Sequence, residues 1–198
     1  MIAEVRVSYG NVEARADEGP DVLLAARLAR GDVAALGEAY DTFHEHVRRF
    51  ARRLIRDASA AEDLVQETFV ALPAAARRYR GDAPLRSFVI GVAANHARHH
   101  ARSLARRAAA MTEVAREGPP PPSGPESKAS RQELAAALRD ALDDLPLDQR
   151  IAIVLCEVEE RTAAEVAKIV GAPEATVRTR VFHGKKKLRE ALAKRGLE

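Results

Sequence analysis

Carboxylate and amide side chains gather on one face of a helix predicted near the middle of the chain. Asp63, Gln66 and Glu67 lie at helical spacing, and Ser59 and Glu62 have the spacing of a capping box at the helix start. The other face carries the apolar side chains of a core: Val65, Phe69, Leu72 and Ala76. Because burial does not require the acidic face, its side chains are available to bind a partner.

Basic side chains dominate the helix that follows a turn at residues 80–84. Its polar face is formed by four residues: Asn95, Arg98, His99 and Arg102. Residues 77–107 carry eight arginines and one aspartate, a net charge of +7, and residues 171–198 carry a net charge of +5. Two basic clusters indicate two contacts with a polyanion. The alternative is that these arginine-rich faces only solvate their helices.

The histidines do not match a metal site. His44, Glu45 and His46 lack the metalloprotease spacing because the fifth position of that motif is Arg48, and the histidines at 96, 99 and 100 have no nearby carboxylate to complete a ligand set. The chain also has no glycine-rich phosphate loop and no nucleophile turn. We therefore expect no catalytic residue, no metal and no cofactor.

Cys156 is the only cysteine among the 198 residues, which excludes an internal disulfide. It lies in an apolar run that starts at Ile151, so a buried structural thiol is predicted. No apolar run reaches the roughly 18 residues of a membrane span, and residues 1–19 lack the apolar core of a signal peptide. We expect a cytoplasmic protein that does not insert into a membrane.

Residues 20–107 predict a compact helical bundle. Asp21 and Asp32 are placed to cap two helices, and the second helix keeps apolar helical spacing from Leu36 to Leu54. The two helices described above complete the bundle. Residues 1–19 are predicted to form a flexible tail.

Residues 108–130 predict a flexible, proline-rich linker. Four consecutive prolines from Pro119 to Pro122 forbid a helix. At about 3.1 Å per residue, residues 118–130 span on the order of 40 Å, more than one DNA turn of roughly 34 Å. Such a tether lets two weak DNA-binding modules act as one tight binder, and a passive spacer is the alternative.

Residues 131–198 predict a second helical domain with a helix-turn-helix. Thr162 and Glu165 form a capping box, Gly171 ends that helix, and Pro173 suits the start of a longer one. In this motif the second helix enters the major groove, where arginine pairs with guanine and lysine follows the phosphates. The candidate contacts on that helix are Thr176, Arg178, Thr179, Arg180, His183, Lys185 and Lys186.

Together these segments resemble bacterial RNA polymerase sigma factors, in the extracytoplasmic-function group of the sigma-70 family. Residues 62–69, 79–82 and 92–95 with Arg102 are similar to conserved region two. Residues 145–150, 162–167, 175–180 and 187–188 are similar to region four. The two regions stand in the family's order with a linker between them.

The resemblance implies a protein that binds core RNA polymerase and promoter DNA to start transcription, and that is masked by an anti-sigma factor. It implies that the clamp helices of the largest polymerase subunit are bound by Asp63, Leu64, Gln66 and Glu67. It assigns the promoter's minus-ten element to Arg78, Tyr79, Arg80, Asn95, Arg98, His99 and Arg102. It assigns the minus-thirty-five element to the candidate contacts on the last helix, from Thr176 to Lys186.

Four residues depart from the family's pattern. Phe88 stands where tryptophan is common, His99 where an acid is common, and Arg161 where an apolar residue is common. Gly184 lies within a helix, where glycine costs about 1 kcal/mol relative to alanine. A stand-alone helix-turn-helix regulator is the alternative function, but it leaves the acidic face without a role. Either function predicts an all-α fold of two small helical domains.

Overall fold

The structure, a computed structural model, describes residues 19–111 and 131–196. Within these ranges the regular structure is helical throughout, which confirms the predicted all-α class. Residues 1–18 of the predicted tail and residues 112–130 of the predicted linker lie outside the described residues. No helix in the described ranges combines the length and the apolar character needed to cross a membrane.

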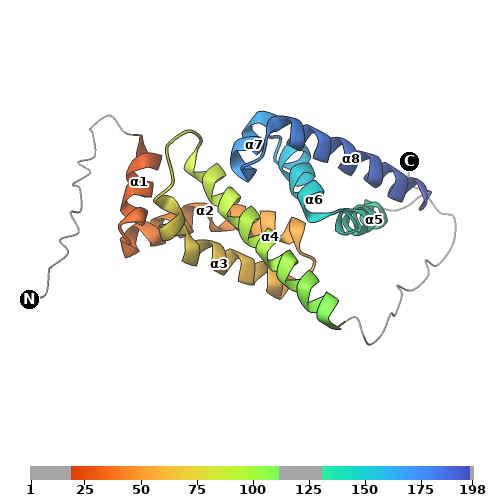
Figure 1. Cartoon of the computed structure of the whole chain (residues 1–198), viewed down its shortest axis with the longest axis horizontal. Coiled ribbons are helices and arrows are strands. Elements are labelled where there is room, and N and C mark those ends of the chain that lie inside the picture. Colours follow the sequence, from red (N-terminus) through yellow and green to blue (C-terminus); the bar gives the residue numbers. More distant parts are fainter. Residues whose placement is uncertain (1–18, 112–130, 197–198) are drawn as a thin grey trace, which may run out of the picture.

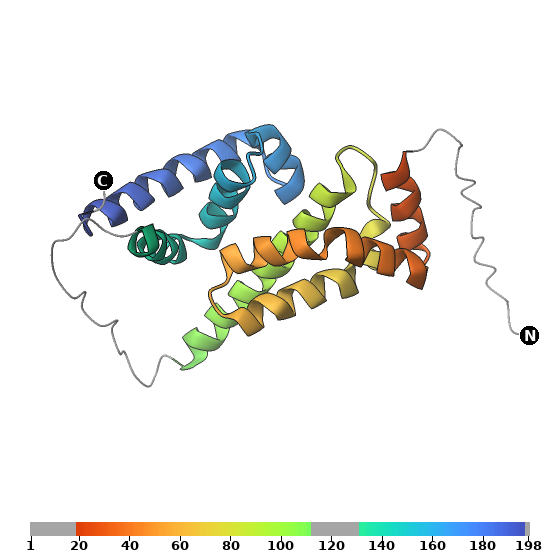
Figure 2. The same cartoon turned by 180° about the vertical axis from the view of Figure 1, so that it is seen from behind.

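Four helices form the first unit. They are α1 (Pro20–Ala29), α2 (Val33–Leu54), α3 (Ala58–Ala76) and α4 (Leu85–Met111). Figure 1 shows α4 lying across α2 and α3, and Figure 2 shows α2 and α3 from the opposite side. The predicted apolar stripes meet inside this bundle, where Phe50, Leu54, Leu72 and Leu85 are almost completely buried. Helix α4 extends four residues beyond the predicted boundary at residue 107.

The helix starts of the first unit confirm one predicted cap and correct two. The Asp32 carboxylate accepts from the N–H groups of Ala34 and Ala35 at 2.9 and 3.2 Å, as predicted. Helix α3 instead begins at Ala58 with Asp57 as its cap, so the predicted capping box at Ser59 was wrong. The reason is that Asp57 offers a carboxylate acceptor two residues earlier.

Asp21 does not cap its own helix either. Helix α1 already begins at Pro20, whose missing N–H suits the first turn, so Asp21 lies inside that turn. Its carboxylate accepts from the N–H of Leu85 at 2.8 Å. It therefore satisfies a free donor at the start of α4 and ties α1 to α4.

The second unit is built from α5 to α8. Its elements are α5 (Arg131–Asp143), α6 (Leu147–Ile153), the π-helical turn η1 (Val154–Val158), α7 (Ala163–Val170) and α8 (Glu174–Ala193). The apolar run that starts at Ile151 thus continues from α6 into a π turn. The capping box of Thr162 and Glu165 is present, and Gly171 has a φ of 63°, which favours glycine.

Gly184 allows α8 to pack closely on α6. It is buried, and a Cβ atom there would stand 2.8 Å from Cγ1 of Ile153. Real carbon atoms do not approach this closely, so a side chain at 184 would push the two helices apart. The glycine inside α8 is therefore explained by packing within the second unit.

The two units pack against each other. Their buried residues form one continuous apolar cluster, which joins Phe50 and Val89 of the first unit to Leu155 and Val166 of the second. Figures 1 and 2 both show α7 and α6 beside the upper half of α4. This closed arrangement determines which candidate site residues are free.

Candidate functional site

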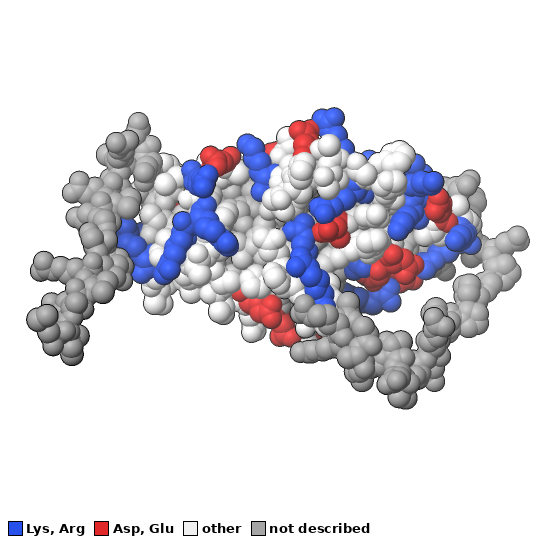
Figure 3. Space-filling view, in the orientation of Figure 1, with Lys and Arg blue, Asp and Glu red and all other residues white. Residues whose placement is uncertain are grey.

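The outer face of α3 presents the predicted acidic surface. Asp63, Gln66 and Glu67 are exposed, and in Figure 3 acidic side chains gather at the lower edge of the first unit, where α3 lies. Leu64 is only 3% exposed, so its side chain packs in the core, and its contact with a partner stays a prediction. Val70 is 80% exposed one turn further along the same face. Sequence reasoning missed it, although its spacing from Asp63 and Glu67 places it there.

A loop after α3 holds the first group of candidate DNA contacts. The Tyr79 hydroxyl donates to the carbonyl of Ala83 at 2.7 Å, and its ring meets Phe88 edge-on with 5.3 Å between centroids. Burial, and then the nearby Asp21 and Asp82 carboxylates, raise the pKa of Tyr79. Its neighbours in sequence, Arg78 and Arg80, are exposed. The loop is therefore anchored by its tyrosine and displays its arginines.

The polar face of α4 contributes the second group. Asn95, His99 and Arg102 are exposed, as predicted. Arg98 is not free, because its Nε atom donates to Asp148 Oδ1 of the second unit at 2.7 Å and its side chain is only 13% exposed. The structure therefore places the four predicted residues on one surface, and one of them, Arg98, is already paired with the second unit.

An open cavity of about 660 Å³ separates this surface from the end of α7. Its lining mixes basic and polar side chains with the apolar side chains of Phe88, Val92 and Ile169. The lining includes Arg78, Tyr79, Arg80, Asn95 and Lys168. The predicted loop contacts and Asn95 of α4 therefore converge on one space, whereas Arg98, His99 and Arg102 lie outside its lining.

The outer side of α8 carries the remaining candidates. Arg178, Thr179, His183 and Lys186 are exposed, whereas Thr176, Arg180 and Lys185 are half-buried. Four of the cations are paired in this arrangement: Arg178 with Glu174 at 2.5 Å, Lys185 with Glu157 at 2.7 Å, Arg180 with Asp148 at 2.7 Å, and Lys186 with Glu190 at 3.9 Å. When DNA binds, its phosphate groups would have to replace these carboxylates as the partners of the cations.

Phe182 is a functional candidate that sequence reasoning missed. It is 65% exposed and lies edge-on to His183, with 5.4 Å between the ring centroids. The signal was present in the sequence, since Phe182 falls outside the apolar stripe that contains Val177 and Gly184. An exposed aromatic ring among cations on this helix is suited to contact a base.

Arg161 lies at the junction of the two units. Its side chain is 18% exposed and lines a small cavity together with His46, Arg86 and Ile169. The departure from an apolar residue at this position is therefore part of the contact between the units.

Metal-ligating side chains do not cluster in the described residues. Nowhere in residues 19–111 or 131–196 do three or more His, Cys, Asp or Glu side chains form a group that could hold a metal ion. Cys156 is half-buried, and burial raises the pKa of its thiol, which disfavours the reactive thiolate.

An exposed acidic face, a basic loop and a helix-turn-helix with basic side chains are typical of a DNA-binding protein that also binds another protein. Comparison with known proteins narrows this class. Residues 39–107 match the family described as Sigma-70 region 2, and residues 135–188 match Sigma-70, region 4.

Two curated relatives span most of the chain. The RNA polymerase sigma factor CarQ of Myxococcus xanthus is 32% identical over 161 residues, which cover 80% of this chain and 91% of CarQ. The RNA polymerase sigma-H factor of Pseudomonas aeruginosa is 27% identical over 180 residues, which cover 87% of this chain and 93% of that factor. The chain therefore belongs to the sigma-70 family of RNA polymerase sigma factors, in its extracytoplasmic-function group. It directs promoter-specific transcription initiation as a partner of core RNA polymerase and promoter DNA.

Solved structures share the fold. The sigma factor RpoE in complex with the anti-sigma factor NepR from Bartonella quintana has a TM-score of 0.61 at 24% identity, covering 79% of this chain and 96% of that one. CnrH in complex with the cytosolic domain of CnrY has a TM-score of 0.59 at 25% identity, and the match covers 87% of this chain and 97% of the CnrH chain.

Proposed function

We propose that this sigma factor docks on the clamp helices of core RNA polymerase through the exposed face of α3. The observation that carries this proposal is that Asp63, Gln66 and Glu67 share one exposed face of α3 with Val70, whereas the opposite face of the helix is buried. Among the described residues, no hydrogen bond or ion pair joins these three side chains to the second unit. The face is therefore accessible even while the units are closed.

Co-elution with sigma-free core polymerase tests the docking face. Replacing Asp63, Gln66 and Glu67 together with alanine should weaken binding by at least tenfold, since interface anchors cost roughly 1–2 kcal/mol each. The matched control replaces Asp41 and Glu45, two exposed carboxylates on α2, and should leave binding intact. Equal binding by the triple variant and the wild type would contradict the assignment of this face.

We further propose that the two DNA surfaces read the two promoter elements. The loop and α4 would hold the minus-ten element through Arg78, Tyr79, Arg80, Asn95, Arg98, His99 and Arg102. Helix α8 would read the minus-thirty-five element through Thr176, Arg178, Thr179, Arg180, His183, Lys185 and Lys186, with Phe182 as an added contact. Two observations support this division: the loop contacts and Asn95 line one cavity, and the remaining candidates lie on the single helix α8.

Three further properties follow from the same proposal. The chain would carry out no catalysis, because the chemistry of transcription belongs to the polymerase. It would act in the cytoplasm, where the polymerase works. An anti-sigma factor would mask it, as a similar sigma factor, RpoE of Bartonella quintana, was solved in complex with one.

A further inference from the structure

The loop between α3 and α4 is supported by the first helix of the chain. Its residues 77–84 include the arginines and the tyrosine proposed for the minus-ten element, and Figures 1 and 2 both show it beside α1. Helix α1 itself is fixed in the bundle, because Leu24, Ala25 and Leu28 are buried in the core. It is therefore a rigid support for a loop that consists of turns and bends.

The first contact is a helix cap supplied from a distance. The first N–H groups of an α-helix have no partner within the helix, and Pro84, directly before α4, has no side-chain acceptor. The Asp21 carboxylate takes this place, since its Oδ2 atom accepts from the N–H of Leu85 at 2.8 Å. Asp32 and Asp57 cap α2 and α3 from directly before each helix, whereas the cap of α4 comes from 64 residues away. The start of α4 is therefore anchored to α1.

The second contact lies at the bend of the loop. Gly81 has a φ of 77°, a left-handed conformation that favours glycine. A Cβ atom there would stand 3.3 Å from Cγ2 of Val22, the residue after Asp21. The Val22 side chain therefore lies against the bend and leaves little free space between the bend and α1.

Contacts within the loop connect this support to the candidate DNA contacts. The Tyr79 hydroxyl donates to the carbonyl of Ala83, and its ring meets Phe88 near the start of α4. Asn95 lies further along the same helix and lines the same cavity as Tyr79. The position of Asn95 relative to the loop thus depends on how the loop joins α4. The Asp21 contact fixes that junction.

We propose that Asp21 and Val22 are positioning residues for promoter recognition, because they hold the loop of residues 77–84 and the start of α4 in the arrangement that binds the unpaired minus-ten strand. The inference rests on the proposed role of this loop and of Asn95. Neither residue needs to touch DNA, since each acts on the backbone of the loop or of α4. Without these contacts the loop samples other shapes, and the affinity falls with the fraction of molecules in the binding shape.

Amide hydrogen exchange measures the support of the loop in the absence of DNA. Asp21→Ala removes the acceptor of the Leu85 N–H, so exchange over residues 77–88 should become faster while exchange in the middle of α2 stays the same. Asp21→Asn should exchange like the wild type, because the amide oxygen of asparagine also caps helices. Val22→Ala should show a smaller acceleration, since it keeps the Asp21 contact.

Binding of single-stranded DNA measures the consequence for recognition. The probe is a strand of about 15 nucleotides, long enough for a single-strand binding site, selected from a random pool with the holoenzyme of core polymerase and this chain. A scrambled strand of the same composition is the reference, and the ratio of the two affinities is the readout. If about one-fifth of the Asp21→Ala molecules keep the binding shape, this ratio falls about fivefold, whereas Asp21→Asn keeps it. A mere charge effect would instead tighten both strands alike in both variants.

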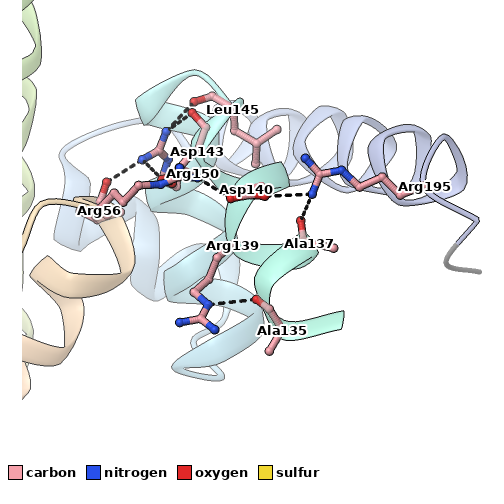
Figure 4. Close-up of polar contacts among 10 residues, drawn as sticks. Arg56, Ala135, Ala137, Arg139, Asp140, Asp143, Leu145, Arg150 and Arg195 are labelled. Carbon is pink, nitrogen blue, oxygen red and sulfur yellow. Dashed lines mark hydrogen bonds and ion pairs between the residues drawn. The ribbon is translucent and has the colours of Figure 1, made fainter. Parts of the chain in front are cut away.

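Two control variants remove a carboxylate elsewhere. Asp57→Ala removes the cap of α3, at the end of that helix away from the loop. Asp140→Ala removes a carboxylate that also joins distant elements, since it pairs with Arg56 at 2.5 Å and with Arg195 at 3.2 Å (Figure 4). Either control can lower the thermal unfolding midpoint, but neither should change the ratio of affinities. A purely structural role of Asp21 would make Asp21→Ala behave like these controls.

Unchanged hydrogen exchange in Asp21→Ala would overturn the proposal. Faster exchange with an unchanged ratio would also overturn it, when Asn95→Ala lowers the ratio and so shows that this surface binds the strand. If Asn95→Ala leaves the ratio unchanged while Asp21→Ala accelerates exchange, the proposed minus-ten surface is wrong and the positioning role in recognition falls with it. Failure of the positioning role and failure of the proposed function therefore give different results.

Discussion

The cations of α8 lie at different positions along the helix, and this difference predicts different effects of their removal on DNA binding. Arg178 is exposed near the start of the helix, where base edges are met, and Lys186 lies two turns later, where the phosphate backbone runs. Arg178→Ala should cost about 1–3 kcal/mol on a selected upstream element and little on random duplex. Lys186→Ala should weaken all duplexes alike and lower the salt slope by about one.

Both losses are measured by titrating selected and random duplexes at several salt concentrations. Arg178 already pairs with Glu174 at 2.5 Å, so Glu174→Gln is a useful companion variant that frees the guanidinium. Identical losses on every duplex for both alanine variants would contradict the division between base and phosphate contacts.

Phe182 predicts a contact that does not depend on charge. Its exposed ring can pack on the C5-methyl group of thymine in the major groove. Phe182→Ala should lose about 1 kcal/mol on the selected element, roughly fivefold in affinity, without loss of folding stability. Replacing each thymine of the element with deoxyuridine should weaken the wild type at one position and leave the variant unaffected there. A variant that stays sensitive at every position would show that Phe182 meets no methyl group.

At the scale of single elements, sequence patterns predicted what depends on local spacing. The apolar stripes, the Asp32 cap and the Thr162 capping box are all present, because each involves residues within one or two turns. The Ser59 box failed because a nearby Asp57 competes for the same helix start. The predicted cap at Asp21 was wrong because its carboxylate accepts from the N–H of Leu85, which is 64 residues away. No local pattern reveals such a partner.

Gly184 predicts a conflict between helix propensity and packing. Gly184→Ala gains about 1 kcal/mol of propensity, but overpacking a filled site costs about 1–3 kcal/mol. Because the added Cβ atom would stand 2.8 Å from Cγ1 of Ile153, the net result should be a destabilised second unit. Thermal unfolding should show a lower midpoint. Ile153→Val removes the Cδ1 atom, 3.2 Å from the added Cβ, but keeps Cγ1, so it should cost less stability in the Gly184→Ala variant than in the wild type. A raised midpoint in the single variant would mean that Ile153 moves aside freely.

At the scale of the whole molecule, the sequence indicated two modules but not their contact. Arg161 was visible as a polar residue at an apolar position, yet its place against His46 and Arg86 depends on how the units pack. Likewise, Asp148 stands in an unremarkable helix start, and only the structure shows it between Arg98 and Arg180. The exposure of most candidate side chains was therefore predictable, whereas the contacts of Asp148 were not, because they join side chains from three different helices.

His46 makes the stability of this arrangement depend on pH. Burial, and then the charges of Arg86 and Arg49, lower the pKa of His46 below its ordinary value of 6.5, against a smaller opposing effect of Glu159. Above that value the imidazole is neutral in the folded and the unfolded chain alike. As the pH falls below it, the unfolded chain takes up a proton that the folded chain resists, so the free energy of unfolding decreases.

Denaturant titrations between pH 7.5 and 5.5 should show this decrease for the wild type and a shallower one for His46→Gln. His100→Gln, a change at an exposed histidine, should keep the wild-type slope, and a wild-type slope in His46→Gln would assign the effect to other groups.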